Sequence, residues 1–340
     1  MDRPLSRATS YDVARLAGVS QSAVSRAFRD GGSISRETRA KVETAARALG
    51  YFPSQIARSL ITQRSRMIGV VMTELTARNY PDVLRSLSNA IQATGNRMLL
   101  CTVPQDAEAA AGAADLFAFH VDGIISSALL PLATLETSER QGVPVVLYNR
   151  ASLSLIASSV ACDHPAAMDR LVGHLAEGGM GRAVFVAGPE SAPVSNDRLL
   201  GVRNALAARG MALGRVLYGD YSYETGRALV NAELSGPDHP DTVICANDAT
   251  ALGVMDAYRF DLGLRVPEDV AVAGFDDVAQ AAWPSYALTT LRQPVERMTQ
   301  MSVRLLMEQV AGTAVGGERR LLPAELRIRA STRRAHIPAP

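Results

Sequence analysis

The chain has 340 residues, 47% of them hydrophobic, and a formal net charge of +1 at pH 7. This length suits one small module plus one or two larger domains with buried cores. A membrane-spanning helix is excluded because no apolar run approaches the roughly 20 residues that it needs, and the N-terminus MDRPLSRATS lacks the apolar segment of a secretory signal. We therefore expect a cytoplasmic protein without membrane contact.

The three cysteines predict neither a metal site nor a disulfide framework. Cys101, Cys162 and Cys245 lie far apart, and none has a histidine at ligand spacing. Isolated cysteines of this kind are typical of buried thiols. We accordingly expect no metal and no cofactor.

Residues 11–28 predict two short helices joined by a turn that contains a glycine. Val13, Leu16 and Ala17 recur at spacings of three and four, which places them on one face of the first helix. Ser20 has the side chain that an N-cap of the second helix needs. The apolar face of the second helix is expected to consist of Val24, Ala27 and Phe28.

The outer face of the second helix carries polar side chains of the kind that read DNA. These are Gln21, Ser22, Ser25, Arg26 and Arg29. Arginine and glutamine make bidentate contacts with base edges in a major groove, and serine binds bases or phosphates. A solvated helix surface is the alternative, because two-helix patterns also occur in proteins that never touch DNA.

A third helix and the local charge favour DNA binding. Ser35 is its expected N-cap and Gly50 its expected end, and the apolar residues at helical spacing between them are Val42, Ala45, Ala46 and Leu49. Residues 1–66 hold 12 Arg or Lys against 5 Asp or Glu, a net charge of +7. Because so basic a module fits a phosphate backbone, we predict a helix-turn-helix DNA-binding domain over residues 1–53.

From residue 67 onward, apolar strands alternate with helices. The predicted strands are 67–73, 97–103, 122–128 and 143–148, followed by 182–187, 215–218, 242–246 and 270–275. The predicted helices are 81–94, 107–120, 165–177, 197–209, 223–234 and 248–261. Such alternation predicts an α/β fold with parallel sheets covered by helices on both faces. The two sets of strands predict two lobes.

Polar side chains follow several of these strands. Open parallel sheets bind ligands beyond the carboxyl ends of their strands. The residues in that position are Tyr80, Asn149-Arg150, Asn247-Asp248 and Asp276-Asp277, while Arg198 adds a cation at a helix start. An Asp or Asn after a strand also serves as an N-cap or turn residue, so each position alone is ambiguous. Their convergence on one cleft favours a ligand site.

The same region lacks the motifs of enzymes that share parallel sheets. Gly178-Gly179-Met180-Gly181 lies between a predicted helix and a strand, so we interpret it as a helix stop and not as a dinucleotide-binding turn. The sequence holds no Gly-x-Ser-x-Gly elbow and no P-loop, and its histidines show no spacing typical of a metal site. We expect a ligand-binding module and not an enzyme.

The motifs of the chain resemble those of the lactose/galactose repressor (LacI/GalR) family. At the N-terminus they run as Thr9-Ser10-Tyr11-Asp12-Val13-Ala14, Ala17-Gly18-Val19-Ser20, Val24-Ser25-Arg26, Leu49-Gly50-Tyr51-Phe52-Pro53 and Ala57-Arg58-Ser59-Leu60. Further along they are Arg198-Leu199-Leu200-Gly201, Ala246-Asn247-Asp248, Gly274-Phe275-Asp276-Asp277, Leu288-Thr289-Thr290 and Arg292-Gln293-Pro294. The resemblance covers nearly the whole chain.

The resemblance implies a hinge helix and a set of DNA contacts. Residues 54–66 by themselves favour a plain linker, because an isolated short helix is marginal in water. In the family, the matching segment folds into a helix on DNA, in pairs, and inserts a leucine between base pairs. Leu60 matches that leucine, and the DNA-binding residues implied are Thr9, Tyr11, Ser20, Gln21, Ser22, Ser25, Arg26, Arg29, Ala57 and Leu60.

The resemblance also implies an effector-binding and dimerisation domain over residues 67–340, with two lobes similar to periplasmic binding proteins. Lobe 1 is expected over approximately 67–160 and 291–319, and lobe 2 over approximately 161–290 and 320–332. The effector-binding residues implied are Tyr80, Asn149, Arg198, Asn247, Asp276 and Gln293. One departure concerns Tyr80, because many family members have paired aromatic residues there.

The sequence thus predicts a transcriptional regulator, with a repressor favoured, whose operator affinity is controlled by a small molecule. We expect a homodimer on a pseudo-palindromic DNA operator, because a two-fold symmetric site requires a symmetric protein, and tetramer formation stays open. A sugar or sugar derivative is the expected effector, because Asn, Asp and Arg offer the mixed donors and acceptors that polyols need. A corepressor such as a purine or a phosphorylated metabolite is the alternative.

Overall fold

The computed structural model describes residues 8–28, 33–52, 64–79, 81–150, 155–236 and 238–332. The chain divides into two compact units, residues 1–66 and 67–340. Of the segment 54–66, which is expected to contain the hinge helix, residues 54–63 lie outside the described residues, as do Arg29 and Tyr80, and the predicted DNA contacts Ala57 and Leu60 fall within 54–63. Within the described residues, no helix is both long enough and apolar enough to cross a membrane.

Three helices form the first unit, namely α1 (Ser10–Ala17), α2 (Gln21–Ala27) and α3 (Arg36–Ala48). Each begins after a hydroxyl side chain that accepts a hydrogen bond from a backbone N–H of the first turn, and these N-caps are Thr9, Ser20 and Ser35. Capping satisfies amide groups that the start of a helix leaves unpaired. The three predicted helices and the two predicted caps are confirmed.

The core of the first unit consists of small apolar side chains from all three helices. Val13, Val24 and Val42 are at most 1% exposed. At the edge of this core, the rings of Phe28 and Tyr51 pack with 6.1 Å between their centroids. A core of this kind keeps the helices in one arrangement while leaving their outer faces free for contacts.

The predicted apolar face of α1 is wrong at Leu16, which is 56% exposed. Val13 and Ala14 are buried instead, and Ala17 is partly buried. Each residue advances an α-helix by about 100°, so Leu16 lies about a third of a turn from the centre of the buried face. Leu49, also expected in the core, is the C-cap of α3 and is 37% exposed.

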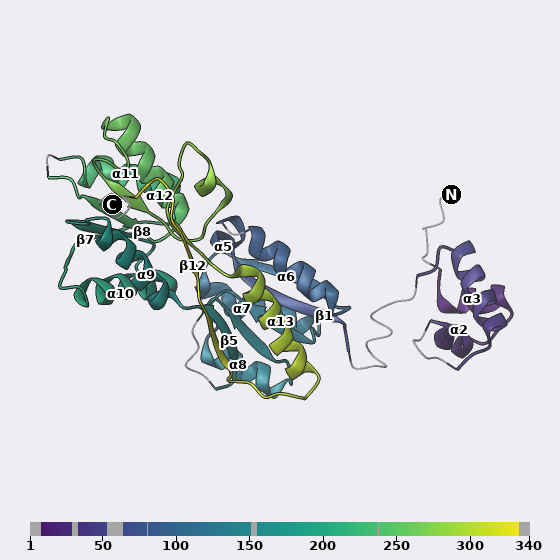
Figure 1. The fold of residues 1–340 in the computed structure, drawn as a ribbon. Coiled ribbons are helices and arrows are strands. Elements are labelled where there is room, and N and C mark those ends of the chain that lie inside the picture. Colours follow the sequence, from purple (N-terminus) through teal and green to yellow (C-terminus); the bar gives the residue numbers. More distant parts are fainter. Residues whose placement is uncertain are drawn as a thin grey trace, which may run out of the picture. The chain divides into compact units, whose positions relative to one another are not determined.

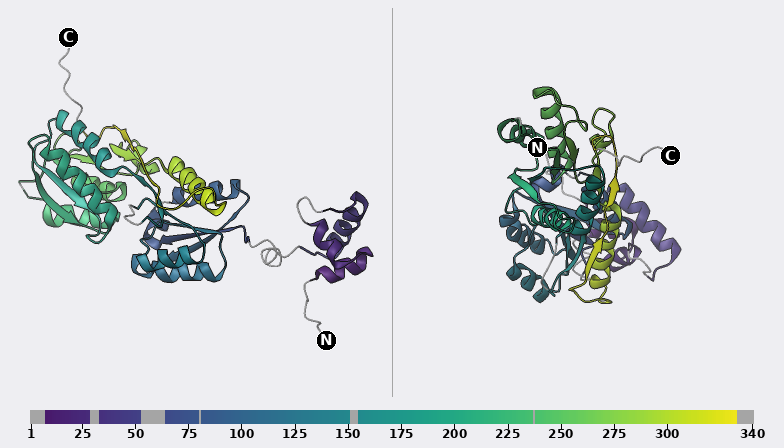
Figure 2. Two further views of the ribbon diagram at one scale, coloured as in Figure 1. Left: turned by 90° about the horizontal axis from the view of Figure 1, so that it is seen from below. Right: turned by 60° about the vertical axis from the view of Figure 1, so that its left-hand side comes forward.

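The second unit contains two parallel sheets, each with helices on both faces (Figures 1 and 2). In lobe 1 the strand order is β11-β5-β4-β3-β1-β2. These strands are β1 (Met67–Thr73), β2 (Arg97–Val103), β3 (Gly123–Ser126), β4 (Val145–Tyr148), β5 (Ser158–Cys162) and β11 (Arg319–Leu322). The strands pair in parallel throughout.

The helices of lobe 1 cover its sheet in two layers. One layer is formed by α6 (Pro81–Ala93) and α13 (Val295–Val310), and the other by α7 (Ala109–Ala118) and α8 (Leu132–Arg140). Successive residues of β1 alternate between the layers, because Val70 packs in the first apolar cluster and Val71 in the second. The short helices α5 (Glu74–Asn79) and η1 (Asp106–Glu108) follow β1 and β2.

Lobe 2 has a four-stranded sheet in the order β7-β6-β8-β9. Its strands are β6 (Ala183–Ala187), β7 (Leu213–Tyr218), β8 (Thr242–Cys245) and β9 (Ala271–Ala273). One face is covered by α9 (His164–Glu177) and α10 (Pro193–Ala207), and the other by α11 (Tyr223–Glu233) and α12 (Asp248–Asp256). The single turns η2 (Ala257–Asp261) and η3 (Ala279–Ala282) complete the lobe.

Two short strands run between the lobes. β10 (Thr290–Arg292) and β12 (Glu325–Arg327) pair antiparallel, and Figure 1 shows β12 crossing from one lobe to the other. The expected lobe boundaries at residues 160 and 319 fall inside β5 and β11, which pair with each other in the sheet of lobe 1. Lobe 1 therefore extends to Cys162 and Leu322, because a boundary cannot cut through a paired strand.

The predicted strands and helices of the second unit are present, with ends shifted by a few residues. Strands β5, β10, β11 and β12 and helices α5, α8 and α13 are absent from the predicted elements. The expected α/β class with two parallel sheets is confirmed. Because all strands of a parallel sheet end at the same edge, each lobe presents one edge of loops to a ligand.

Candidate functional site

The polar face of α2 is exposed in the first unit. Gln21, Ser22, Ser25 and Arg26 all lie on this surface. The Gln21 side-chain amide donates a hydrogen bond to the Ser10 hydroxyl at 3.4 Å, which links the start of α2 to α1. The four side chains predicted to contact bases are therefore brought together on one open face.

Two of the predicted DNA contacts also cap helices. The Thr9 hydroxyl accepts a hydrogen bond from the Asp12 N–H at 3.4 Å and donates one to the Asp12 carboxylate at 2.7 Å. The Ser20 hydroxyl accepts one from the Ala23 N–H at 3.2 Å. Thr9 and Ser20 are exposed, and Tyr11, a further predicted contact, is 69% exposed. Capping thus holds the Thr9 and Ser20 hydroxyls at the surface.

A cavity of about 500 Å³ lies at the carboxyl ends of the strands in the second unit, and we call it the cleft. Loops after β1, β2, β3 and β4 of lobe 1 and after β6 and β7 of lobe 2 contribute to its lining. Representative residues are Thr73, Pro104, Ser127, Asn149, Pro189 and Tyr221. The strand ends of both lobes therefore converge on one space, as the strand-end rule predicts.

A chain of hydrogen bonds joins the two lobes beside the cleft. The Asn149 side-chain amide donates to the Gln293 side-chain oxygen at 3.1 Å, and the Gln293 amide donates to the Asp276 carboxylate at 2.7 Å. Asn149 has φ 52° and Asp276 has φ 120°. Asparagine tolerates the first value, whereas the second lies in a region that residues other than glycine seldom adopt, and backbone strain of that kind clusters at functional sites. Asn149 and Gln293 line the cleft, whereas Asp276, a predicted effector contact, is bonded to Gln293 and lines a second cavity.

Arg198 lines the cleft from α10 with its side chain 1% exposed. One terminal nitrogen is 3.4 Å from the Asp276 carboxylate, and the other donates to the Ala246 carbonyl. The inner nitrogen donates to His164 Nδ1 at 3.4 Å. The guanidinium carbon lies 3.7 Å from the centre of the Phe275 ring. Together these charge-assisted and cation–π contacts hold the cation in one position.

His164 is buried behind this arginine. Burial, and then the charges of Arg198 and Arg150, lower the pKa of His164 well below its usual value. The imidazole therefore stays neutral at physiological pH. A neutral ring is required here because its Nδ1 accepts the hydrogen bond from Arg198.

Asn247 has a structural role that differs from the predicted one. It caps α12 by accepting a hydrogen bond from the Thr250 N–H at 3.1 Å, and it donates to the Tyr221 carbonyl at 3.0 Å. The residue is 2% exposed, and it is not among the described residues that line the cleft. The carboxamide oxygen of Asn247 thus caps the helix, and its nitrogen holds the backbone of Tyr221, a residue that does line the cleft.

The cleft also contains Arg150, which follows β4 next to Asn149, and three residues that are not among the predicted ones, namely Ser127, Tyr148 and Asp106. The Arg150 guanidinium donates to the Ser127 carbonyl at 2.8 Å and lies 3.4 Å from the Asp106 carboxylate. Ser127 directly follows β3 and Tyr148 ends β4, so the strand-end rule identifies both when it is applied to every strand. Asp106 lies in the η1 turn, and no sequence signal marks it.

Comparisons with known proteins agree with this arrangement. Residues 9–54 match the model of bacterial regulatory proteins of the lacI family, and residues 172–332 match a periplasmic binding protein-like domain. The HTH-type transcriptional repressor CytR of Escherichia coli K12 is 31% identical over 330 residues, which cover 96% of each chain. The chain belongs to the LacI family of bacterial regulatory proteins.

Solved LacI-family structures share the fold over nearly the whole chain. A lac repressor dimer bound to operator and to the anti-inducer ONPF superposes with a TM-score of 0.86 at 28% identity, covering 96% of this chain and 99% of that one. A complex of the regulator CelR with cellobiose gives a TM-score of 0.71 at 30% identity, covering 96% and 100%. The predicted family and fold are confirmed, and the protein is a DNA-binding transcriptional regulator.

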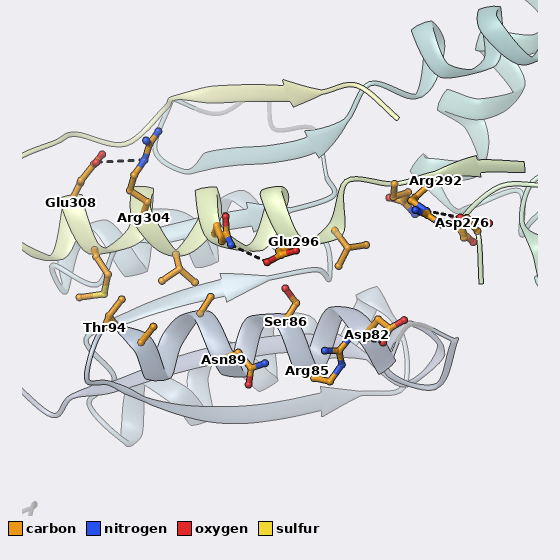
Figure 3. A pocket seen from close by; sticks show the side chains of 18 of the residues that line it. Asp82, Arg85, Ser86, Asn89, Thr94, Asp276, Arg292, Glu296, Arg304 and Glu308 are labelled. Atoms are coloured by element: carbon orange, nitrogen blue, oxygen red, sulfur yellow. Dashed lines mark hydrogen bonds and ion pairs between the residues drawn. The ribbon is translucent and has the colours of Figure 1, made fainter. Parts of the chain in front are cut away.

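This LacI-family protein has a second and larger cavity of about 1000 Å³ between α6 and α13 (Figure 3). Its walls carry charged side chains that pair on their own helix, because Arg85 lies 3.0 Å from Asp82 and Arg304 lies 3.7 Å from Glu308. It runs along the flank of lobe 1 and reaches only the ends of β9 and β10, where Asp276, Asp277, Arg292 and Gln293 line it, whereas loops after six strands line the cleft. The cleft therefore remains the better candidate for a small-molecule site.

Asp248 links α12 to the strand that crosses between the lobes. Its buried carboxylate accepts hydrogen bonds from the Thr290 hydroxyl at 2.5 Å and from the Val278 N–H at 2.9 Å. Burial, and then the charge of Asp276, raise the pKa of Asp248 to about 7. This LacI-family member thus keeps a titratable carboxyl group at the base of its crossing strands.

We expect Asp248 to make the stability of the second unit depend on pH. Because its pKa is higher in the folded than in the unfolded protein, the folded protein binds this proton more readily. The free energy of unfolding should therefore fall as pH rises from about 4 to about 7. Asp248→Asn should reduce this slope in urea unfolding at a series of pH values. An unchanged slope would contradict the prediction.

Replacing Arg26 or Gln21 with alanine is expected to weaken specific operator binding by about 1–3 kcal/mol, because one good base contact contributes that much discrimination. Binding to random DNA should change much less. Arg47→Ala is the matched control, because Arg47 is also exposed but lies on α3. Fluorescence anisotropy with specific and random duplexes measures both effects. An equal loss on both duplexes would indicate phosphate contacts only.

Proposed function

We propose that this protein is a repressor whose affinity for a pseudo-palindromic operator is controlled by a sugar or sugar derivative bound in the cleft. It acts as a homodimer in the cytoplasm, and it is not an enzyme. The observation that carries this proposal is the convergence of strand ends from both lobes on one cavity, in a chain that also has an exposed helix-turn-helix face.

Related proteins support the dimer, the operator and the sugar in this proposal. The lac repressor structure contains a dimer, an operator and an anti-inducer, and the CelR structure contains cellobiose. Those ligands and that assembly belong to those proteins. Their extension to this chain is supported by similarity over 96% of its length.

The chemistry of the cleft supports a polyol. Asn149 and Gln293 provide carboxamides, Arg198 a guanidinium, and Ser127 and Tyr148 hydroxyl groups. This mixture of donors and acceptors suits a compound with several hydroxyl groups. A volume of about 500 Å³ also lies within the range of roughly 300–1,000 Å³ that is typical of small-molecule sites.

A route from effector to operator is supported by the bonds between the lobes. Asn149 belongs to lobe 1 and Asp276 to lobe 2, and Gln293 on the crossing segment connects them. An effector that competes for any of these hydrogen bonds has a different affinity for the state in which the lobes are bonded to each other than for the state in which they are not. Only such a difference in affinity can shift the equilibrium that DNA binding depends on.

The proposal is tested in two stages with the full chain. Operator sites are first selected from random DNA, and we expect a two-fold symmetric consensus because a dimer binds two half-sites. Pentoses, hexoses and disaccharides are then screened by thermal shift, and at least one should raise the unfolding midpoint. An asymmetric consensus would contradict the dimer, and no shift with any sugar would contradict the effector class.

A further inference from the structure

The charged side chains of the cleft are paired with one another. Arg150 lies 3.4 Å from Asp106, and Arg198 lies 3.4 Å from Asp276. All three nitrogens of the Arg198 guanidinium have a partner within the protein. Across the residues that the structure describes, each cation that lines the cleft is therefore matched by an acidic partner.

This balance of charges opposes an anionic ligand. Two arginines are matched by two aspartates, so the charges of these four side chains cancel. A phosphate group would bring a charge of about −1.5 to −2 at pH 7. Burying that charge is strongly unfavourable unless an unneutralised cation is available, and here the charge of each arginine is already balanced by a carboxylate, although the guanidinium can still donate hydrogen bonds to a neutral ligand.

Two uncharged hydroxyl groups behave differently, because they have no hydrogen-bond partner within the described part of the chain. They belong to Ser127, which is 5% exposed, and Tyr148, which is 3% exposed, and both residues line the cleft. Burial raises the pKa of Tyr148, so its hydroxyl stays protonated and can both donate and accept. A ligand hydroxyl would supply the partner that each group lacks.

Apolar side chains form much of the remaining wall. They come from both lobes and include Val83, Leu129, Ala192 and Val194. Such a wall suits the C–H face of a sugar ring, whereas it offers no donor to a phosphate.

We propose that the effector is an uncharged polyhydroxy compound and that Tyr148 and Ser127 bind its hydroxyl groups, so that phosphorylated sugars are excluded from the cleft. This inference rests on the proposed function, because it takes the cleft to be the effector site. It makes two residues outside the predicted set determinants of specificity.

The first test compares matched ligands on the full-length protein. Isothermal titration is carried out with ribose and ribose 5-phosphate, glucose and glucose 6-phosphate, galactose and galactose 1-phosphate, and with cellobiose. The parent sugar of at least one pair, or cellobiose, should bind. Each phosphate ester should bind at least 10-fold more weakly than its parent sugar, or not at all.

The second test uses Tyr148→Phe and Ser127→Ala with the neutral sugar that binds best. Each variant should weaken that sugar at least 10-fold. The unfolding midpoint of the ligand-free variant should stay unchanged or rise, because the deleted hydroxyl has no partner to lose. Tyr218→Phe is the matched control, because Tyr218 is 43% exposed on β7 and does not line the cleft, and it should alter neither quantity.

The outcomes separate this inference from the proposed function. A phosphate ester that binds more tightly than its parent sugar would overturn the inference alone, as would a Tyr148→Phe variant with undiminished affinity for the neutral sugar. If no compound of the panel binds, the sugar effector itself fails, and the inference fails with it.

Discussion

Arg198→Ala is expected to lower the free energy of unfolding of the second unit by about 3–5 kcal/mol and to abolish the effector response. The Arg198 and Asp276 side chains are 1% and 5% exposed. Removing one partner of a buried ion pair leaves the other charge without compensation, which accounts for a loss of this size. Urea unfolding and sugar titration of the same variant measure the two effects.

Two controls give this prediction its specificity. Arg209→Ala removes an arginine whose pair with Asp169 is 30% and 57% exposed, so it should cost less than about 1 kcal/mol. The double variant Arg198→Met/Asp276→Asn removes both charges and should regain much of the lost stability without regaining effector binding. A double variant that binds the effector with wild-type affinity would remove both residues from the site.

Asp277→Ala is expected to cost about 3 kcal/mol or more, because this carboxylate holds both crossing segments. Its side chain is 1% exposed, and it lies 2.5 Å from Arg292 at the end of β10 and 2.5 Å from Arg329 beyond β12. Loss of the carboxylate leaves the Arg329 cation, whose side chain is 19% exposed, without this acidic partner. The free energy of unfolding in urea is the quantity to measure.

The backbone at Asp277 supplies a way to isolate the charge. Asp277 has φ 58°, a conformation that Asn tolerates and Ala does not. Asp277→Asn should therefore keep the local backbone and lose only the ion pairs. Its free energy of unfolding should lie between that of the wild type and that of Asp277→Ala. Asp82→Ala, which removes a carboxylate that is 79% exposed, should have little effect. If Asp277→Ala were as stable as Asp82→Ala, the crossing segments would not depend on this carboxylate.

The elements with a strong local pattern could be predicted from the sequence. Strands β1 and β2 match the predicted ranges 67–73 and 97–103 at both ends, because each is a long run of apolar residues bounded by polar ones. The N-caps Ser20 and Ser35 could also be predicted, because a hydroxyl side chain before an amphipathic segment is a local signal of a helix start.

Elements that depend on distant partners could not be predicted. β5 and β11 read SSVAC and RRLL, and neither is a continuous apolar run such as GIIS in β3 or VVLY in β4. They become strands because they pair with each other across more than half of the second unit. In contrast, α13 has apolar residues at helical spacing throughout. This helix could therefore have been predicted from the sequence, although it is not among the predicted elements.

The candidate site shows the same division. Asn149 and Gln293 follow from strand-end positions and from family motifs, and both line the cleft. The partners of these side chains do not follow from the sequence, because the Arg150–Asp106 contact joins two loops. Whether Asn247 caps a helix or meets a ligand depends on where the Tyr221 carbonyl lies, which only the fold determines.

The central claim is that ligand binding in the cleft and operator binding are linked. Linkage requires that the sugar change operator affinity by the same factor by which the operator changes sugar affinity. The most direct test is therefore to titrate labelled operator by fluorescence anisotropy with and without the sugar that gives the largest thermal shift, and to titrate that sugar with and without saturating operator. We predict equal changes of about fivefold or more in both experiments. An operator affinity that stays the same at sugar concentrations that saturate the protein would contradict the account.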